Sequence, residues 1–357
     1  MNVAIYSPYL DTFGGGEKYI LTIAQTLSKV SQVDLLFDNN LLTKGAEKLK
    51  NDLAKRFDLD LANVKVVKAP LGKSSNILKR MLFLKKYDLF FYLTDGSIFY
   101  STAKKNILHI QSPVTGHSPM NLWTRIKLNS WNIIIYNSLF TKNNCQSYWK
   151  IKSQVIYPPV DVEKIKPLKK KKYILSVGRF FGYLKDKKYE VLIGVFKDLY
   201  NNRKLDEWSL YLVGSAGEGD IGYLEELKDL AKGAPIKFYP NLEYNQLINL
   251  YGEASLYWHA AGFEENDPTK MEHFGISTVE AMAAGVVPVV INKGGQTEIV
   301  EQAKSGFLWD SIEDLKSYTI KLVKDINLQK EISKESLKRA SNFSREEFEK
   351  KILELAK

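Results

Sequence analysis

Several common features are missing from this sequence, and each absence excludes a class of protein. A single cysteine, Cys145, excludes an internal disulfide and fits a reducing compartment. No segment approaches the roughly 20 apolar residues that a membrane-spanning helix needs. The first residues, Met1 to Ser7, have no basic region and no long apolar run, so we expect a first strand there and not a signal peptide. We therefore expect a cytoplasmic protein.

Acidic residues are scarce in the first half of the chain. Up to Val160 the sequence holds 21 Lys and Arg against 10 Asp and Glu, whereas the remainder holds 30 against 31. No acidic residue occurs between Gly96 and Val160. The asymmetry indicates either an anionic partner for this half or the solvated faces of a lysine-rich protein. We expect no nucleic-acid partner, because the chain has no recognised nucleic-acid module and its aromatic residues are not interleaved with basic ones.

Motifs for the common cofactors and metals are also missing. The loops Gly14-Gly15-Gly16-Glu17 and Gly214 to Gly219 fit neither G-x-G-x-x-G nor the Walker A spacing, which argues against an oxidoreductase or a P-loop enzyme. The four histidines are scattered and form no zinc motif with the single cysteine. Asp58-Leu59-Asp60 imitates a metal-binding D-x-D, but no strand ends at it, so we interpret it as a solvated loop. We expect no metal and no cofactor.

Short apolar runs alternate with amphipathic stretches along the whole chain. This alternation predicts an α/β fold with parallel sheets and helices on both faces. Pro158-Pro159 interrupts the pattern, which restarts at Tyr173, so we expect two tandem, doubly wound Rossmann-like domains that face each other across a cleft. The predicted strands are Val3–Tyr6, Val33–Phe37, Val64–Val67, Leu89–Leu93, Asn106–Ile110, Asn132–Tyr136, Tyr173–Val177, Ser209–Val213, Ile236–Tyr239, Ala254–Trp258 and Val287–Ile291.

Two carboxylates eight residues apart, Glu272 and Glu280, form the most informative pattern. We expect a helix to begin near Gly275, which places Glu280 on the helix and Glu272 in the loop before it. The pair would present one carboxylate to each end of an elongated ligand, with the amides of the helix entry between them.

Two further segments indicate an anionic group on that ligand. Gly14-Gly15-Gly16 follows the first strand and opens a helix, where backbone amides approach an anion closely. Arg179 follows a strand and a glycine, with Lys187 shortly after, so these cations would neutralise a diphosphate leaving group. A flexible turn and solvated lysines are the alternative interpretations.

Taken in order, these segments resemble the retaining family 4 glycosyltransferases of GT-B fold, over nearly the whole chain. Trp258 to Gly262 and Pro268 to Met271 are similar to the branch related to lipid-linked-oligosaccharide mannosyltransferases. The motifs that carry the resemblance are Gly14–Glu17, Ile156–Asp161, Ser176–Phe180 with Lys187, Glu272–Gly285, Gly294-Gly295, Glu298–Val300 and Gly306–Leu308.

The resemblance implies a role for each domain. Residues 1–158 would form an N-terminal acceptor-binding domain and residues 159–340 a C-terminal nucleotide-sugar-binding domain. Residues 341–357 would form a C-terminal helix that packs back toward the N-terminal domain. A nucleotide diphosphate sugar would be the donor, and a glycan or a lipid-linked glycan the acceptor.

The resemblance also implies a role for each site residue. Glu280 would bind the ribose hydroxyls, Glu272 the donor hexose, and the Phe274, Gly275 and Ile276 amides the hexose or phosphate oxygens. Arg179 and Lys187 would stabilise the departing diphosphate, which Gly15 and Gly16 would meet from the N-terminal domain. The base would lie near Gly214 and Asn241. None of these roles needs a metal ion.

One stretch departs from the family pattern. Many members have a histidine two residues before a proline at the end of an N-terminal strand, near the donor sugar. Here that place belongs to Gln111, and His109 lies two residues earlier on the same side of the strand. Either side chain would contact the sugar, with a buried core role as the alternative for His109.

We therefore expect a hexosyltransferase of cell-surface glycan biosynthesis, with a non-catalytic nucleotide-sugar-binding subunit or scaffold as the alternative. The basic N-terminal half, with Trp123 and Trp131 as expected exposed aromatics, favours peripheral contact with an anionic membrane. The nucleotide base, the sugar, the acceptor and the linkage stay open at this point.

Overall fold

The computed structural model describes residues 1–12, 14–72, 75–94, 96–114, 122–145 and 151–357. The chain divides into two compact units, each described here by itself. Unit 1 comprises Met1–Pro159 and Glu346–Lys357, and unit 2 comprises Val160–Arg345. The sequence analysis placed these divisions after residues 158 and 340.

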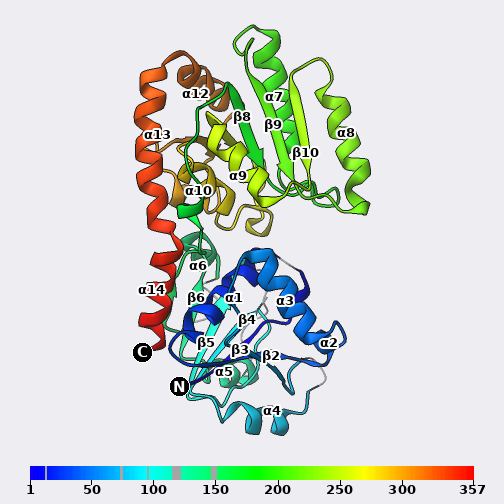
Figure 1. Cartoon of the computed structure of the whole chain (residues 1–357), viewed down its shortest axis with the longest axis vertical. Coiled ribbons are helices and arrows are strands. Elements are labelled where there is room, and N and C mark those ends of the chain that lie inside the picture. The colour runs from blue at the N-terminus through cyan, green and yellow to red at the C-terminus, as the bar shows by residue number, and fades with distance from the viewer. Residues whose placement is uncertain (13, 73–74, 95, 115–121, 146–150) are drawn as a thin grey trace. The chain divides into compact units, whose positions relative to one another are not determined.

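Unit 1 is built on a parallel sheet of seven strands in the order β3-β2-β1-β4-β5-β6-β7. Figure 1 labels β2 to β6 of this sheet. Its strands are β1 (Asn2–Tyr6), β2 (Gln32–Phe37), β3 (Val64–Lys68), β4 (Leu89–Thr94), β5 (Lys105–Ile110), β6 (Ile133–Tyr136) and β7 (Ser153–Val155). Its helices are α1 (Gly15–Ser28), α2 (Asn39–Leu42), α3 (Ala46–Phe57), α4 (Ile77–Leu84), α5 (Leu122–Leu128), α6 (Leu139–Cys145) and α14 (Arg345–Ala356).

Both faces of this sheet are buried. All six residues of β4 are buried, and the first five alternate between two hydrophobic clusters, with Leu89 in one and Phe90 in the other. The first cluster receives Tyr19 from α1 and Phe348 from α14, so the C-terminal helix belongs to the core of unit 1. The second receives Leu84 from α4. A parallel sheet needs such cover, which explains why its strands are continuous apolar runs.

Unit 2 repeats the architecture with six parallel strands in the order β10-β9-β8-β11-β12-β13. Its strands are β8 (Tyr173–Val177), β9 (Ser209–Gly214), β10 (Ile236–Pro240), β11 (Leu256–His259), β12 (Val287–Ile291) and β13 (Phe307–Trp309). Its helices are α7 (Tyr189–Asn201), α8 (Ile221–Ala231), α9 (Tyr244–Glu253), α10 (Ile276–Ala283), α11 (Gln296–Ile299), α12 (Ile312–Lys324) and α13 (Ile326–Ala340).

The strand order places a topological switch point in each unit. Successive strands spread in opposite directions from β1 and β4 in unit 1, and from β8 and β11 in unit 2. Open α/β sheets bind ligands outside the carboxyl ends of their strands at such points. The parallel α/β class predicted from the sequence is therefore confirmed. We expect ligand-binding residues in the loops that follow these four strands.

The structure also corrects parts of the sequence analysis. The three-residue edge strands β7 and β13 were not predicted, and β11 begins at Leu256 and not at Ala254. Trp131, expected to be exposed, is buried among aromatic side chains, and its indole N–H donates to the carbonyl of Phe99 at 2.9 Å. Among the described residues, no helix combines the length and the apolarity needed to traverse a bilayer.

Candidate active site

The carboxyl edge of the unit 2 sheet gathers ionisable side chains at its switch point. β8 ends at Val177 and leads into Gly178 and Arg179, while the neighbouring strand β11 ends at His259. Arg179 is exposed, with its guanidinium 5.5 Å from the centre of the Phe181 ring. The topology thus brings an exposed guanidinium and a buried imidazole to the ends of the two strands between which a ligand is expected.

Lys187, Glu272 and His259 form one cluster at this edge. The Lys187 ammonium donates to Glu272 Oε2 at 2.8 Å, and His259 Nε2 lies 3.2 Å from the same oxygen. Asp186 Oδ2 lies 3.7 Å from the ammonium. The Lys187 and Glu272 side chains keep 18% and 20% of their surface exposed, whereas His259 keeps 3%. The cluster is therefore open to a ligand on the Lys187–Glu272 side only.

Electrostatics fixes the protonation of the cluster. Burial alone would raise the pKa of Glu272, but the Lys187 ammonium and the hydrogen bond to His259 outweigh it and hold that pKa well below its usual range. Burial lowers the pKa of His259, against the opposing effect of Glu272. A neutral imidazole beside a carboxylate must donate its proton, so we assign the Nε2–H tautomer to His259. Glu272 is thus an ionised acceptor held in one orientation from two sides.

The backbone around Glu272 is held equally closely. The Gly295 amide donates to the carbonyl of Glu272 at 2.8 Å. A Cβ on Gly294 would lie 2.3 Å from that same carbonyl oxygen, so only glycine permits this approach. Gly275 has φ +118°, a left-handed conformation that side chains rarely adopt, and it caps α10. Phe274 is buried against the Phe343 ring at 5.6 Å, and Ile276 begins the helix.

Glu280 lies on α10, as the sequence predicted, with Glu272 in the preceding loop. Glu280 is buried, and its Oε2 accepts a hydrogen bond of 3.0 Å from the Tyr251 hydroxyl on α9. Burial raises the pKa of the Tyr257 hydroxyl, and the charges of Glu272 and Glu280 raise it further. The same hydroxyl donates a hydrogen bond to the Ser277 hydroxyl at 2.8 Å. The two acids therefore both act on the Tyr257 hydroxyl, Glu272 from the loop before α10 and Glu280 from the helix itself.

Gly214 and Asn241, predicted near the base, are brought together after β9 and β10. The Asn241 amide donates to the Gly214 carbonyl at 2.8 Å, and the Asn241 side chain bonds both backbone groups of Ala216 at 3.0 Å. Asn241 has φ +57°, which an asparagine tolerates better than most residues. The two segments form one exposed rim beside the β8 loop.

In unit 1 the glycine loop meets one of the two candidate polar residues. A Cβ on Gly16 would lie 2.0 Å from Gln111 Oε1, so the glycine and this half-buried side chain are in direct contact. The Gly14 amide donates to Glu17 Oε2 at 2.7 Å, so it is used inside the loop, which leaves Gly15 and Gly16 as the first amides of α1.

His109 takes a different position. It is fully buried, and its ring stacks on Tyr19 with a centroid distance of 3.9 Å. Burial lowers its pKa to about 3, which keeps the imidazole neutral. This placement agrees with the alternative of a core histidine, and Gln111 is the candidate that reaches the glycine loop.

Sequence reasoning missed two members of the unit 2 cluster. His259 was noted as one of four scattered histidines and as part of the Trp258 to Gly262 segment, but it was given no role in the site, and Asp186 was not singled out at all. A signal for His259 was present, because it follows the apolar run that became β11, and a polar residue at the carboxyl end of a parallel strand points to the ligand edge.

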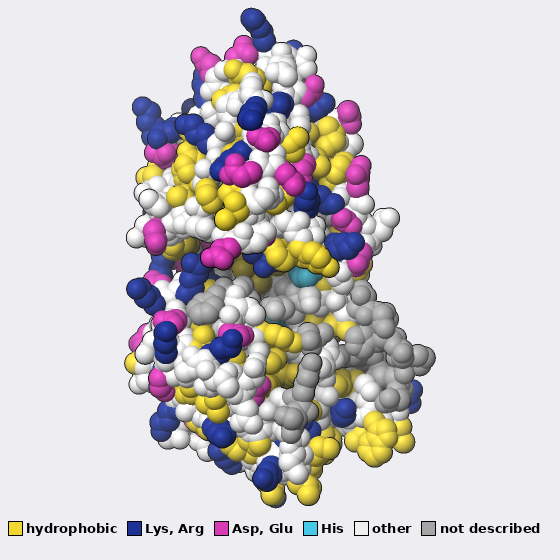
Figure 2. All heavy atoms as spheres, turned by 90° about the vertical axis from the view of Figure 1, so that its right-hand side faces the viewer, with side chains coloured by type: hydrophobic (Ala, Val, Ile, Leu, Met, Phe, Trp, Pro, Cys, Tyr) yellow, Lys and Arg dark blue, Asp and Glu magenta, His cyan; other side chains and the backbone are white. Residues whose placement is uncertain are grey.

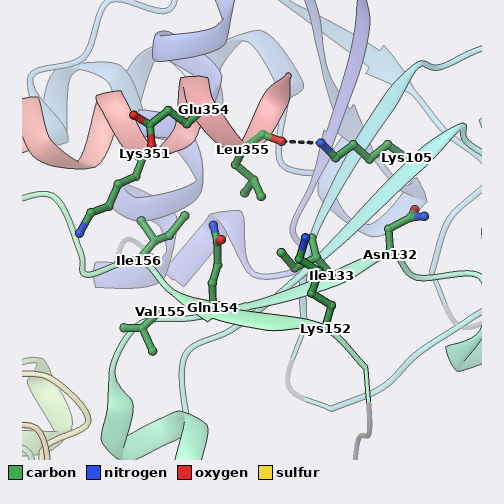
Figure 3. A pocket seen from close by; sticks show the side chains of 10 residues that line it. All are labelled: Lys105, Asn132, Ile133, Lys152, Gln154, Val155, Ile156, Lys351, Glu354 and Leu355. Carbon is green, nitrogen blue, oxygen red and sulfur yellow. Dashed lines mark hydrogen bonds between the residues drawn. The ribbon is translucent and has the colours of Figure 1, made fainter.

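The structure also contains a cavity that lies away from these residues. It measures about 470 Å³ and lies in unit 1 between α14 and the sheet, where Lys105, Asn132 and Lys152 mark the amino ends of β5, β6 and β7. Figure 3 shows the Lys105 ammonium donating to the Leu355 carbonyl of α14, at 2.6 Å. This edge is opposite to the one where open α/β sheets bind ligands. Within all the described ranges, including this cavity, no group of three or more His, Cys, Asp or Glu residues is placed to hold a metal ion.

Comparison with known proteins assigns the family. The family model described as Glycosyl transferases group 1 matches residues 160–339, just over half of the chain. The chain belongs to this family. The matched segment is almost all of unit 2 and contains the whole Lys187–Glu272–His259 cluster.

Curated relatives of this group 1 glycosyltransferase are mannosyltransferases. The GDP-Man:Man(3)GlcNAc(2)-PP-Dol alpha-1,2-mannosyltransferase of Homo sapiens is 31% identical over 241 residues, covering 61% of this chain and 46% of the human protein. The Dictyostelium discoideum protein of the same name is 28% identical over 247 residues, covering 63% and 47%. The chain therefore spans about half the length of the curated relatives it matches.

Solved structures match over nearly the whole length. Anabaena Alr3699/HepE, solved with UDP and glucose, has a TM-score of 0.70 at 18% identity, with 99% of each chain covered. A glycosyltransferase from Rickettsia africae has a TM-score of 0.74 at 17% identity, with 99% and 97% covered. Identities this low show the fold alone, and that fold is GT-B, as predicted.

Proposed function

We propose that this protein transfers a mannose from GDP-mannose to a lipid-linked glycan, with retention of the anomeric configuration and without a metal ion. The observation that carries the proposal is the Lys187–Glu272–His259 cluster at the switch point of unit 2, with Glu280 on the helix that follows. GDP-mannose is favoured over other donors because the curated relatives are named for it.

The arrangement suits the departure of a diphosphate. The bond between the sugar C1 and the phosphate oxygen breaks, which places positive charge on the sugar and negative charge on the diphosphate. Arg179 and Lys187 stabilise that negative charge as fixed cations in a site that excludes part of the solvent. The first amides of α10, at Ile276 and Ser277, have no acceptor within their own helix and suit the same oxygens.

The two carboxylates would divide the donor between them. Glu280, oriented by Tyr251, accepts hydrogen bonds from the ribose hydroxyls. Glu272 shares Oε2 with Lys187 and His259, and its second oxygen accepts from a hexose hydroxyl. The new bond forms between the acceptor oxygen and C1 on the face that the phosphate leaves, and a phosphate oxygen takes the acceptor's proton. No protein nucleophile is needed for this sequence.

Metal independence rests on these fixed cations. Asp58 ends helix α3 in a left-handed conformation, and Asp60 accepts from the Ala62 amide, so this D-x-D closes a turn. A transfer assay with and without EDTA tests the point. An unchanged rate is expected, whereas a loss of activity that Mg²⁺ or Mn²⁺ restores would contradict it.

A lipid-linked acceptor implies contact with a membrane, and the basic unit 1 supplies the charge for it. We propose peripheral association with an anionic leaflet. Co-sedimentation with vesicles at rising salt tests this, and binding that ignored both anionic lipid and salt would contradict it.

The alternative is a subunit that binds nucleotide sugars without transferring them. A thermal-shift screen across UDP-, GDP- and ADP-sugars identifies the donor, because a ligand that binds the native state raises its stability. Transfer of labelled mannose to a dolichyl- or polyprenyl-linked oligosaccharide then separates the two functions. A GDP-mannose shift with no transfer to such acceptors would favour the binding subunit.

A further inference from the structure

Helix α4 of unit 1 exposes three of its six apolar residues to solvent. Ile77, Leu78 and Leu82 are 61%, 70% and 74% exposed. Arg80 turns inward instead, with its guanidinium 4.7 Å from the Phe99 ring and Nη1 3.2 Å from the Ser75 hydroxyl. A surface helix of a soluble protein normally shows the reverse arrangement. Exposed aliphatic residues gathered in this way indicate a contact surface.

Helix α5 of the same unit also exposes large apolar side chains. Leu122 and Trp123 are 70% and 71% exposed, whereas Leu128 at the other end is buried in the cluster that also receives Leu84 of α4. A cavity of about 560 Å³ is lined by Leu82 of α4 and by Ser130, which follows α5. The two helices therefore cover one hydrophobic cluster, to which each contributes a buried leucine.

Figure 2 shows hydrophobic side chains gathered at the end of unit 1 where Figure 1 labels α4.

The charge around these residues has one sign. Lys79, Lys85 and Lys86 accompany α4, and Arg125 and Lys127 lie on α5. No acidic residue occurs between Leu61 and Tyr87 or between Gly96 and Val160. The nearest acid in the chain after α4, Asp88, is engaged by the Lys104 ammonium at 2.7 Å. Cations beside exposed aliphatic and indole groups are the composition of an interfacial membrane contact.

We propose that α4 and α5 form a membrane-contact surface that places Leu78, Leu82 and Trp123 among the headgroups of an anionic leaflet. The surface consists of Ile77, Leu78, Leu82, Leu122 and Trp123 with the five cations named above. This inference rests on the proposed lipid-linked acceptor, and it names the part of unit 1 that meets the lipid. An anionic bilayer is favoured over a protein partner because the charged residues of α4 and α5 are all cations and lie among exposed aliphatic and indole groups.

The first test removes the apolar contacts. Leu78→Ser/Leu82→Ser is compared with wild type for co-sedimentation with phosphatidylcholine vesicles that contain phosphatidylglycerol. Partition should fall about tenfold for each leucine removed. The matched control is Leu230→Ser/Ile326→Ser, which changes two exposed aliphatic residues of unit 2 and should bind like wild type. Both leucines of α4 are exposed, so the fold should tolerate the change.

The second test reports position directly. The only native cysteine, Cys145, is buried, so Leu82→Cys and Leu230→Cys each accept an environment-sensitive fluorophore at one site. Emission at position 82 should shift to the blue when anionic vesicles are added, and emission at position 230 should not. Vesicles of phosphatidylcholine alone should give the smaller shift.

Three results would overturn the proposal. One is equal partition of the α4 variant and wild type, and another is a label at position 82 that stays in water while the chain sediments with vesicles. The third is a wild-type chain that binds no vesicle, which would leave a protein partner as the occupant. The thermal shift with GDP-mannose, measured on the same variants, is expected to equal that of wild type. If GDP-mannose caused no thermal shift in wild type, the donor assignment would be wrong, and the result on membrane contact would still hold.

Discussion

The Lys187–Glu272 pair should serve both stability and catalysis, and Lys187→Met separates the two. The variant leaves the Glu272 carboxylate with His259 as its remaining partner in the cluster. Removing one partner of a buried pair costs about 3–5 kcal/mol, and the 18% and 20% exposure of these side chains reduces that to about 2–3 kcal/mol. For a domain of this size the midpoint of thermal unfolding should fall by about 4–12 °C.

The catalytic effect should be larger than the stability effect. If the ammonium also stabilises the departing diphosphate, kcat/KM should fall by about 10²–10³, the usual consequence of removing one fixed charge-stabilising donor. The assay is transfer of mannose from GDP-mannose at a temperature where both proteins are folded.

Lys188→Met is the matched control. The next lysine pairs with Glu265 at 2.7 Å with 24% and 22% exposure, so the two variants lose a similar ion pair. Only Lys187→Met should lose catalysis. Equal activity of the two variants would refute the diphosphate role, and additive stability losses in Lys187→Met/Glu272→Gln would refute the coupling between the two side chains.

Three further outcomes are expected. Gly275→Ala should cost about 1–3 kcal/mol in thermal unfolding because its φ of +118° strains any side chain, and an unchanged midpoint would show that the turn relaxes. His109→Phe should retain kcat/KM within a few-fold, because one neutral ring stacked on Tyr19 is replaced by another neutral ring. A hundredfold loss of kcat/KM with unchanged stability would instead indicate that His109 contacts the donor sugar. The depressed pKa of Glu272 stabilises the fold above its unfolded pKa of about 4.3, and that contribution disappears as the pH falls through the folded value, so acid unfolding of Glu272→Gln should respond less to pH between those two values than wild type.

The sequence predicted the regular parts of the fold because long apolar runs between helices leave few alternatives. Tyr173–Val177 and Val287–Ile291 match β8 and β12 residue for residue. The strands that it missed, β7 and β13, have three residues each and lie at sheet edges, where pairing with one neighbour defines them more than composition does.

The candidate site was predictable where the backbone itself carries the signal. Gly275 and Glu280 were placed correctly at the cap and on the helix because a glycine turn followed by a helix is a local pattern. The contact between Lys187, which follows β8, and Glu272, which follows β11, depends on these two strands lying side by side, which no local pattern specifies. The burial of Trp131 and the exposure of the α4 leucines could not be predicted from local patterns either, because tertiary packing decides which aromatic side chain is buried and which leucine faces water.

The most direct test of the account is a calorimetric titration of GDP-mannose into wild type, Glu280→Ala and Tyr251→Phe. We predict that wild type binds and that Glu280→Ala binds about tenfold to a hundredfold more weakly, because the ribose loses hydrogen bonds to a charged group. Tyr251→Phe removes the same internal hydrogen bond but keeps the carboxylate, so it should bind much more like wild type. Equal affinity for wild type and Glu280→Ala, or no binding of any nucleotide sugar, would contradict the central claim that unit 2 holds the donor.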